Sequence, residues 1–283
     1  GTPLFSALRM MALRAKVLDA LRRLGARPRL LPLLAVWLGA PTVRSSLPFA
    51  LRELFHREGL RMYRLRSNDR RVAIRHGSGD IVILGEVFNR RYYEPVGEAA
   101  RVLSSASNIL DLGGNVGLFG LFAADRWPAA RIVAFEPDPD NVTVHEMTID
   151  ANDLGGRWQL VKAAAAAHDG HVSFAAGHAA VSHIADVAGG EGTIEVQTVD
   201  VLPRIAEADL LKMDIEGGEW AILADPRFRM APPRAVVLEY HLRMCPGPSP
   251  RREAEQALSA AGLHVQSTSD RGDGQGVLWA WRT

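Results

Sequence analysis

The chain has 283 residues, of which 47% are hydrophobic and 23% are charged, and its formal net charge is +1. This composition excludes a chain that is disordered throughout, and it suffices for one large α/β domain with a smaller appendage. The single cysteine, Cys245, excludes an internal disulfide and a zinc site made of cysteines, so we expect a reducing, cytoplasmic setting. The apolar stretch 30–41 contains Pro32 and is shorter than the ~20 residues that span a bilayer, so no transmembrane helix is expected.

The N-terminal quarter of the chain is strongly basic. Residues 1–71 contain 15 Lys and Arg against 4 Asp and Glu, a net charge of +11, which leaves −10 for residues 72–283. Over residues 4–38, apolar residues recur at helical intervals with arginines between them, which predicts a basic amphipathic helix and a second, shorter one. We therefore expect residues 1–70 to form a helical extension. We expect it to dock on the main domain or to form a homodimer. The alternatives are peripheral contact of residues 1–45 with the inner face of a membrane, and a surface extension without a partner.

The main domain is expected over residues 71–283. Its first runs, 71–75 and 80–84, flank a turn at 77–79 and predict a β-hairpin. Short apolar runs then alternate with helical patterns, which is typical of an α/β fold with a doubly wound, mostly parallel sheet. The expected strands are 109–112, 131–135, 159–163, 172–174, 194–198, 210–213 and 235–239. The last two runs, 263–267 and 277–281, predict a terminal hairpin that puts an antiparallel strand at the end of the sheet.

The most informative segment is 108–117, which reads as a buried strand that breaks into a glycine loop where a helix should begin. Glycines let the backbone approach a ligand closely, and the amino end of the next helix attracts negative charge. The spacing Asp-x-Gly-x-Asn-x-Gly differs from Gly-x-Gly-x-x-Gly, which argues against the rival interpretation of a nicotinamide-dependent oxidoreductase. Glu136 follows the next strand, where a carboxylate can bind ribose hydroxyls. These features predict a site for a nucleotide-like cofactor.

Acidic residues and a histidine follow two later strands. Asp214 ends the run 210–213, and Glu239 and His241 lie at the end of 235–239. Because ligands of such sheets bind at the carboxyl ends of the strands, we expect all these groups to open onto one crevice with the glycine loop. His241 has a reference pKa of ~6.5 and suits a general base, with a structural histidine as the alternative interpretation. By contrast, His145 is expected at the surface.

These motifs resemble the FkbM family of S-adenosylmethionine-dependent methyltransferases. The resemblance covers roughly residues 71–281 and is carried by segments 111–117, 134–139, 150–152 and 210–219. The family usually has alanine where this chain has Gly114, and isoleucine or valine where it has Met213 and Ile215. The resemblance implies a class I methyltransferase fold of the Rossmann-like type. It also implies an O-methyltransferase that acts on a hydroxyl of a sugar, glycolipid or polyketide-type natural product.

The resemblance further implies roles for individual residues. The cofactor-binding residues would be Asp111 and Asn115 at the amino-acid end, Gly113 and Gly117 in the loop, Glu136 on the ribose, Pro137 and Ala164 near adenine, and Asp214 at the ammonium. The catalytic residues would be His241, Asp214 and Glu239. Mg²⁺ is an open alternative, and its oxygen ligands would be Asp214, Glu216 and Glu239.

The expected partner is a small-molecule or glycan acceptor. Nucleic acid is not expected, because the main domain has no evident basic groove rich in aromatic residues. The alternative function is a non-catalytic protein that binds the cofactor or serves as a scaffold at a membrane surface through its basic N-terminal helix. Either protein would be cytoplasmic, with the membrane's inner face as a possible site of peripheral contact.

Overall fold

The computed structural model describes residues 36–37, 39–175, 183–184, 193–270 and 274–282. The chain divides into two compact units, Gly1–Tyr92 and Tyr93–Thr283. The predicted N-terminal helices at 4–38 fall almost entirely outside the described residues. Within the described part, no helix combines the length and the apolar character needed to cross a membrane.

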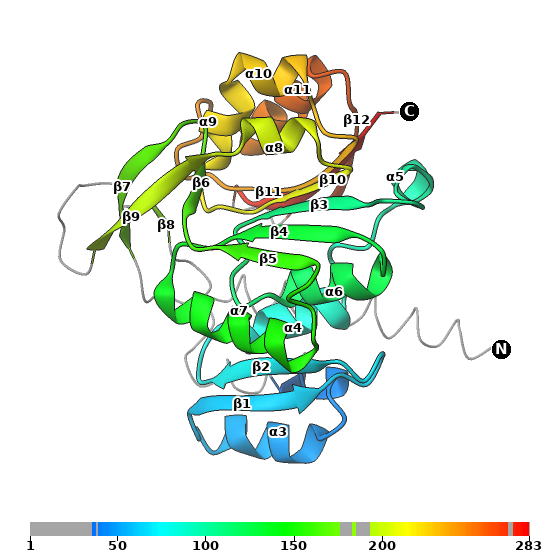
Figure 1. The fold of residues 1–283 in the computed structure, drawn as a ribbon, viewed down its shortest axis with the longest axis vertical. Coiled ribbons are helices and arrows are strands. Elements are labelled where there is room, and N and C mark those ends of the chain that lie inside the picture. Colours follow the sequence, from blue (N-terminus) through cyan, green and yellow to red (C-terminus); the bar gives the residue numbers. More distant parts are fainter. Residues whose placement is uncertain (1–35, 38, 176–182, 185–192, 271–273, 283) are drawn as a thin grey trace. The chain divides into compact units, whose positions relative to one another are not determined.

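The first unit contains a two-stranded antiparallel sheet with short helices. Its elements are η2 (Ala40–Thr42), α3 (Ser46–Leu54), β1 (Gly59–Arg64), β2 (Arg71–His76) and α4 (Asp80–Phe88) (Figure 1). The strands β1 and β2 pair in register, with Tyr63 opposite Val72. A buried hydrogen-bonded chain runs from Tyr63 through His76 to Glu53, with distances of 2.5 Å and 2.6 Å.

The predicted hairpin of 71–75 and 80–84 is wrong: the first run is a strand, but the second is not. β2 pairs with the preceding strand β1, and residues 80–84 belong to the helix α4. Asp80 fixes the start of this helix, because its carboxylate accepts hydrogen bonds from the backbone N and the guanidinium of Arg75. Ile81, Leu84 and Val87 are buried at helical spacing. Four consecutive apolar residues carry no period that separates a helix from a strand, and tertiary packing decides.

The second unit is built on a seven-stranded sheet. Its strands are β3 (Asn108–Leu112), β4 (Arg131–Phe135), β5 (Trp158–Val161), β10 (Leu210–Met213), β11 (Ala235–Tyr240), β12 (His264–Asp270) and β13 (Gly276–Trp281). Their order is β12-β13-β11-β10-β3-β4-β5, and all neighbours are parallel except those of β13. This confirms the predicted α/β fold with a mostly parallel sheet.

The terminal hairpin forms at the end of the sheet, as predicted. β13 lies between β11 and β12, and β12 is the edge strand. The sequences explain this order. Every residue of β13 is buried, as a strand covered on both faces requires, whereas exposed and half-buried residues alternate along β12.

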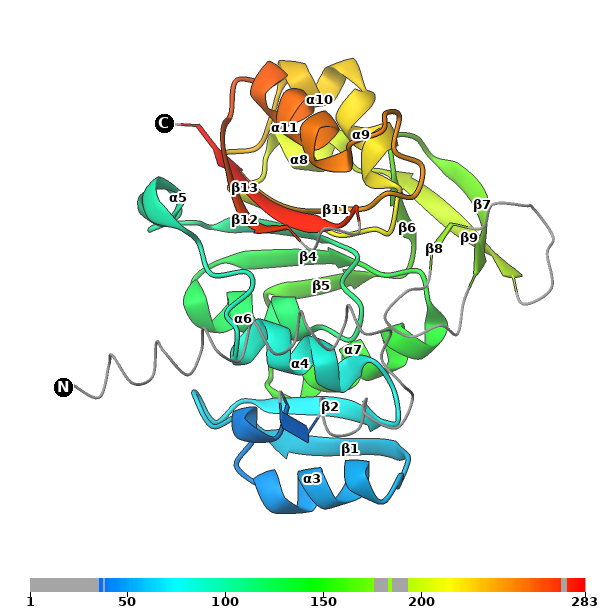
Figure 2. The same cartoon turned by 180° about the vertical axis from the view of Figure 1, so that it is seen from behind.

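Helices cover both faces of the sheet. These helices are α5 (Gly97–Val102), α6 (Leu118–Arg126), α7 (Pro139–Ala151), α8 (Leu202–Ala206), α9 (Glu219–Ala224), α10 (Pro226–Met230) and α11 (Pro250–Ala260). Figures 1 and 2 show α8 to α11 on one face and α6 and α7 on the other. The main core lies under α8 to α11, where side chains such as Ile205, Ile222 and Phe228 pack on Leu211 and Val236 of the strands. The fold is thus doubly wound, and the carboxyl ends of its parallel strands meet at one edge.

A second, smaller sheet takes up two of the predicted strands. It consists of β6 (Ala164–Ala166), β7 (Gly170–Ala175), β8 (His183–Ile184) and β9 (Thr193–Asp200) in the order β6-β9-β7-β8. The runs 172–174 and 194–198 therefore pair with each other and not with the main sheet. Ala164 lies in β6 and packs with Phe174 and Val196.

Candidate active site

The glycine loop joins the ends of three strands. Gly113 and Gly114 follow β3, and their backbone N atoms donate to the carbonyl of Phe135 at the end of β4, at 3.1 Å and 2.8 Å. Gly113 has φ +82°, and a Cβ at this position would lie 1.8 Å from the carbonyl oxygen of Asp214, which follows β10. Only glycine permits this approach of β3 to β10. Gly117, with φ +84°, precedes α6.

The carboxylate of Glu136 accepts a hydrogen bond from the backbone of the glycine loop and two more from residues that follow it in the sequence. The carboxylate of Glu136 accepts from the N atoms of Asn115 at 2.7 Å and of Asp138 at 2.9 Å, and from Nδ2 of Asn141 at 3.3 Å. Burial raises the pKa of Glu136 to about 7, although these hydrogen bonds act in the opposite direction. The side chain of Asn115 turns back on its own loop, where Oδ1 accepts from the N atom of Val116. Pro137, the next residue, is half-buried.

His145 supports the loop from α7, and its predicted position at the surface is wrong. The ring is fully buried, packs edge-to-face on Trp158 and places Nδ1 2.9 Å from the carbonyl oxygen of Asn115. Burial lowers the pKa of His145 to about 4, so the imidazole is neutral near pH 7 and donates from Nδ1 to that carbonyl. The polar character of a lone histidine suggested exposure, and only the fold around it shows the contrary.

Lys212 connects the glycine loop with two carboxylates. Its side chain is buried in β10, and Nζ donates to the carbonyl of Gly113 at 2.6 Å. Nζ also lies 3.3 Å from Oδ1 of Asp111 and 3.6 Å from Oδ2 of Asp214. Burial alone would lower the pKa of Lys212, but these two carboxylates outweigh it and raise the pKa. No role was predicted for Lys212 from the sequence, although a lysine among the apolar residues of a central strand needs a buried partner.

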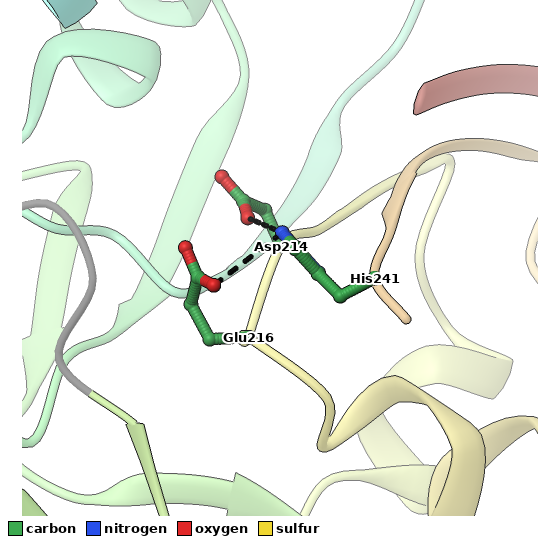
Figure 3. A group of neighbouring side chains, drawn as sticks. All are labelled: Asp214, Glu216 and His241. Atoms are coloured by element: carbon green, nitrogen blue, oxygen red, sulfur yellow. Dashed lines mark ion pairs between the residues drawn. The ribbon is translucent and has the colours of Figure 1, made fainter. Parts of the chain in front are cut away.

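Asp214, Glu216 and His241 form one cluster at the ends of β10 and β11 (Figure 3). Nε2 of His241 lies 3.7 Å from Oδ1 of Asp214 and 3.6 Å from Oε2 of Glu216. The His241 side chain is 3% exposed, whereas those of Asp214 and Glu216 are 24% and 25% exposed. The expected third carboxylate, Glu239, lies within β11 and is not a member of this cluster.

A buried glutamate orients His241. Oε1 of Glu219 accepts from the backbone N of His241 at 2.9 Å and from its Nδ1 at 3.0 Å, and Oε2 accepts from the N atom of Gly217 at 2.8 Å. Burial alone would lower the pKa of His241, but the hydrogen bond that its ring donates to Glu219 and the charges of Asp214, Glu219 and Glu216 raise the pKa to about 10. The sequence motifs gave no role in the site to Glu219, although its spacing of five residues from Asp214 was the available signal.

Tyr93 orients Asp214 from the other side. Its hydroxyl donates to Oδ2 of Asp214 at 3.3 Å, and its ring packs edge-to-face on Phe119. The structure therefore brings the predicted site residues together in two groups, one at the glycine loop with Glu136 and one around Asp214, and Lys212 links the two groups. One predicted residue, Ala164, lies apart from both groups in the smaller sheet. Glu239 lies within β11 and outside the cluster of Asp214, Glu216 and His241, but its charge acts on Lys212.

The sheet order, the glycine loop after β3 and the acidic groups after β4 and β10 define a Rossmann-like methyltransferase of class I. The sequence profile of the family described as the methyltransferase FkbM domain matches residues 111–262, more than half of the chain. The chain belongs to the FkbM methyltransferase family, as the resemblance of its motifs indicated.

Individual proteins are similar over smaller or more divergent regions. The AMB antimetabolite synthetase AmbE of Pseudomonas aeruginosa is 56% identical over 36 residues, which are 13% of this chain and 2% of that protein. An O-methyltransferase family protein from Burkholderia thailandensis is 16% identical over 72% of this chain and 58% of that chain, with a TM-score of 0.44. Methyltransferase FkbM from Methylobacillus flagellatus is 16% identical over 71% of this chain and 54% of that one, with a TM-score of 0.45. The chain thus covers little more than half of these structures and a small part of the synthetase.

Proposed function

We propose that the protein is an S-adenosylmethionine-dependent O-methyltransferase whose acceptor is a hydroxyl of a sugar, glycolipid or polyketide-type natural product. Membership of the FkbM family makes it a methyltransferase. The observation that carries the cofactor proposal is the contact between Glu136 and the glycine loop, where the backbone N of Asn115 meets the Glu136 carboxylate at 2.7 Å. A carboxylate held at this place, after the second strand of such a sheet, is suited to ribose hydroxyls.

The residues present fit this cofactor. The carbonyl of Asp214 occupies the space where a Cβ of Gly113 would be, so the loop lies close to the end of β10. The residues that would hold the cofactor are Gly113, Asn115, Gly117, Glu136, Pro137 and Asp214, with Asp111 acting through Lys212 and Ala164 as the adenine contact. When bound, S-adenosylmethionine supplies a methyl group that its sulfonium makes electrophilic.

The protein's own task is then to align the acceptor and to receive its proton. Alignment of the acceptor oxygen with the methyl group can contribute roughly 7–11 kcal/mol to lowering the barrier. The hydroxyl proton must leave as the new C–O bond forms. His241 was the expected base, but with its pKa raised to about 10 the imidazole already carries two protons near pH 7. The carboxylates of Asp214 and Glu216 are the members of this cluster that can accept a proton, and Glu239 adds negative charge near Lys212.

Calorimetry with S-adenosylhomocysteine tests the proposal. We expect one site per chain, and at least ~10-fold weaker binding for Glu136→Gln, because charge-assisted hydrogen bonds to ribose would be lost. Glu146→Gln is the matched control, since Glu146 is a half-buried carboxylate of α7 paired only with Lys162 in the described residues. No binding by the wild-type protein would overturn the proposal, and unchanged binding by Glu136→Gln would remove that residue's role.

The basic N-terminal segment supports a separate proposal about location. We propose that the enzyme is cytoplasmic and that residues 1–45 bring it to the inner face of a membrane, on the basis of the +11 charge of residues 1–71. Sedimentation with anionic liposomes, with and without residues 1–45, tests it. Equal partitioning of the two proteins would contradict membrane contact and leave docking or a homodimer as the role of the segment.

A further inference from the structure

The cluster of Asp214, Glu216 and His241 combines one imidazole nitrogen with two carboxylates at the carboxyl ends of adjacent strands (Figure 3). We infer that these three residues bind a divalent transition-metal cation. The role of the cation in methyl transfer rests on the proposed function. The cation site itself rests on the donor atoms and on the groups that orient them.

The donor atoms are already gathered around one point. Oδ1 of Asp214 and Oε2 of Glu216 lie 3.7 Å and 3.6 Å from Nε2 of His241, and one ligand atom of each residue lies within 4.8 Å of the others. An ion with bonds of ~2.1 Å holds neighbouring ligand atoms ~3 Å apart and opposite ones ~4 Å apart. Small movements of the two half-exposed carboxylate side chains would therefore close the site.

His241 directs Nε2 at this point. The side chain is 3% exposed, and Nε2 forms ion pairs with Oδ1 of Asp214 at 3.7 Å and Oε2 of Glu216 at 3.6 Å. The proton on Nε2 would be released when a cation takes its place between the same carboxylates. Its other nitrogen is held by Glu219, which contributes no ligand and is itself fully buried. A ligating histidine in proteins is commonly fixed in this way, by a carboxylate on the opposite ring nitrogen.

Asp214 is oriented in the same manner. Oδ2 accepts from the hydroxyl of Tyr93 and lies 3.6 Å from Nζ of Lys212, so that Oδ1 is the oxygen directed at His241. Two of the three ligands thus have a supporting partner outside the cluster. These supporting contacts are separate from the ion pairs within the cluster. Partners of this kind, which orient the ligands, are characteristic of metal sites in proteins.

The donor set selects the type of cation. Mg²⁺ and Ca²⁺ prefer oxygen ligands alone, whereas an imidazole with two carboxylates suits Mn²⁺ and its heavier first-row neighbours. With the proposed acceptor, the hydroxyl oxygen would meet the cation, and its O–H bond would break more readily. Because Asp214 and Glu216 would then hold the cation, the proton would pass to water and not to their carboxylates. The acceptor oxygen would then form a bond to the methyl carbon as the bond between that carbon and sulfur breaks. The electron pair of the broken bond would stay on sulfur.

Titration with Mn²⁺ alone, followed by the electron paramagnetic resonance signal of the free ion, tests the inference. We expect one saturable Mn²⁺ site per full-length chain, and affinity for Mg²⁺ at least ~10-fold weaker. His241→Gln and Glu216→Gln should each weaken Mn²⁺ binding at least ~10-fold, and Glu219→Gln should weaken it ~10–100-fold through loss of orientation. The matched controls are His171→Gln and Glu146→Gln, which change an exposed and a half-buried residue outside the site.

Glu216→Gln keeps the test valid if His241→Gln does not fold, because Glu216 lies in a loop and is 25% exposed. No binding at millimolar Mn²⁺, or equal binding by wild type and Glu216→Gln, would overturn the inference. Binding of S-adenosylhomocysteine, measured in the presence of a chelator, separates this result from the proposed function. If that binding persists while Mn²⁺ fails to bind, the cation site is refuted and the proposed function stands; the reverse pattern refutes the proposed function alone.

Discussion

The imidazole of His145 lies so close to Gly114 that a Cβ at position 114 would be 2.8 Å from Cε1 of the ring. The ring cannot easily retreat, because Nδ1 is bonded to the carbonyl of Asn115 and the far face contacts Trp158. The glycine that this chain carries in place of the family's usual alanine therefore has a physical cause. An alanine at position 114 would bring its methyl group against the ring of His145.

We expect Gly114→Ala to lower the free energy of unfolding by ~1–3 kcal/mol, as overpacking of a close-packed site does. His145→Ala should relieve most of that cost in the double variant, since the clash is with the ring. Chemical denaturation of the wild type, both single variants and the double variant measures the coupling. Additive effects would show that the methyl group finds room without movement of His145.

The lowered pKa of His145 predicts a loss of stability in mild acid. The unfolded chain binds a proton at this histidine near pH 6.5, whereas the folded chain does so only near pH 4. Over that window the unfolded state binds more protons, so the free energy of unfolding falls as the pH falls, by up to ~3 kcal/mol. The measurement is the difference between wild type and His145→Asn in denaturant unfolding from pH 7 to pH 4. A difference independent of pH would contradict the neutral, buried ring.

The raised pKa of Glu136 predicts that cofactor binding depends on pH. Ribose hydroxyls donate to the ionised carboxylate, so the affinity for S-adenosylhomocysteine should rise as the pH rises through about 7. Binding at pH 6.5 should release a fraction of a proton, which calorimetry detects as a dependence of the heat on the buffer. Glu136→Gln should abolish that dependence. Proton release that persists in this variant would assign the titration to another group.

Gly113 should be among the glycines least tolerant of substitution. A Cβ there would lie 1.8 Å from a backbone oxygen of Asp214, and the positive φ adds strain. We expect Gly113→Ala to cost roughly 3 kcal/mol or more, or to prevent folding. Gly155→Ala is the matched control, because nothing lies within 4 Å of its Cβ position. Similar melting temperatures for the two variants would refute the close approach of β3 and β10.

Several parts of the fold could be predicted because one local signal sufficed. The glycine loop, the parallel strands before it and after it, and the acids at strand ends all follow from short patterns. The helix α4 could not, because its run of four apolar residues has no period and its start depends on Asp80 meeting Arg75. The position of β13 inside the sheet could have been predicted from the sequence, since its continuous apolar run contrasts with the alternating pattern of β12.

The residues that support the site were the least predictable. Glu219 and His145 have their roles through partners distant in the sequence, 22 and 30 residues away, and a polar side chain by itself does not reveal a buried partner. Lys212 is similar, since its contact with Gly113 spans 99 residues. The cluster at His241 was predicted in part, because adjacent parallel strands bring their ends together, but Glu239 lies within β11 and is not a member of it.

The ends of β3, β10 and β11 carry an excess of negative charge. Five carboxylates, those of Asp111, Asp214, Glu216, Glu219 and Glu239, stand against two cations, Lys212 and His241, which leaves a net charge of −3 when all are ionised. Such a region attracts positively charged ligands and binds neutral ones less well, and added salt weakens the preference. The proposed methyl donor carries a positive charge on its sulfur when it binds. After the methyl group has been transferred, the sulfur is neutral. The same charges that favour its entry would therefore favour its departure once the methyl group has gone.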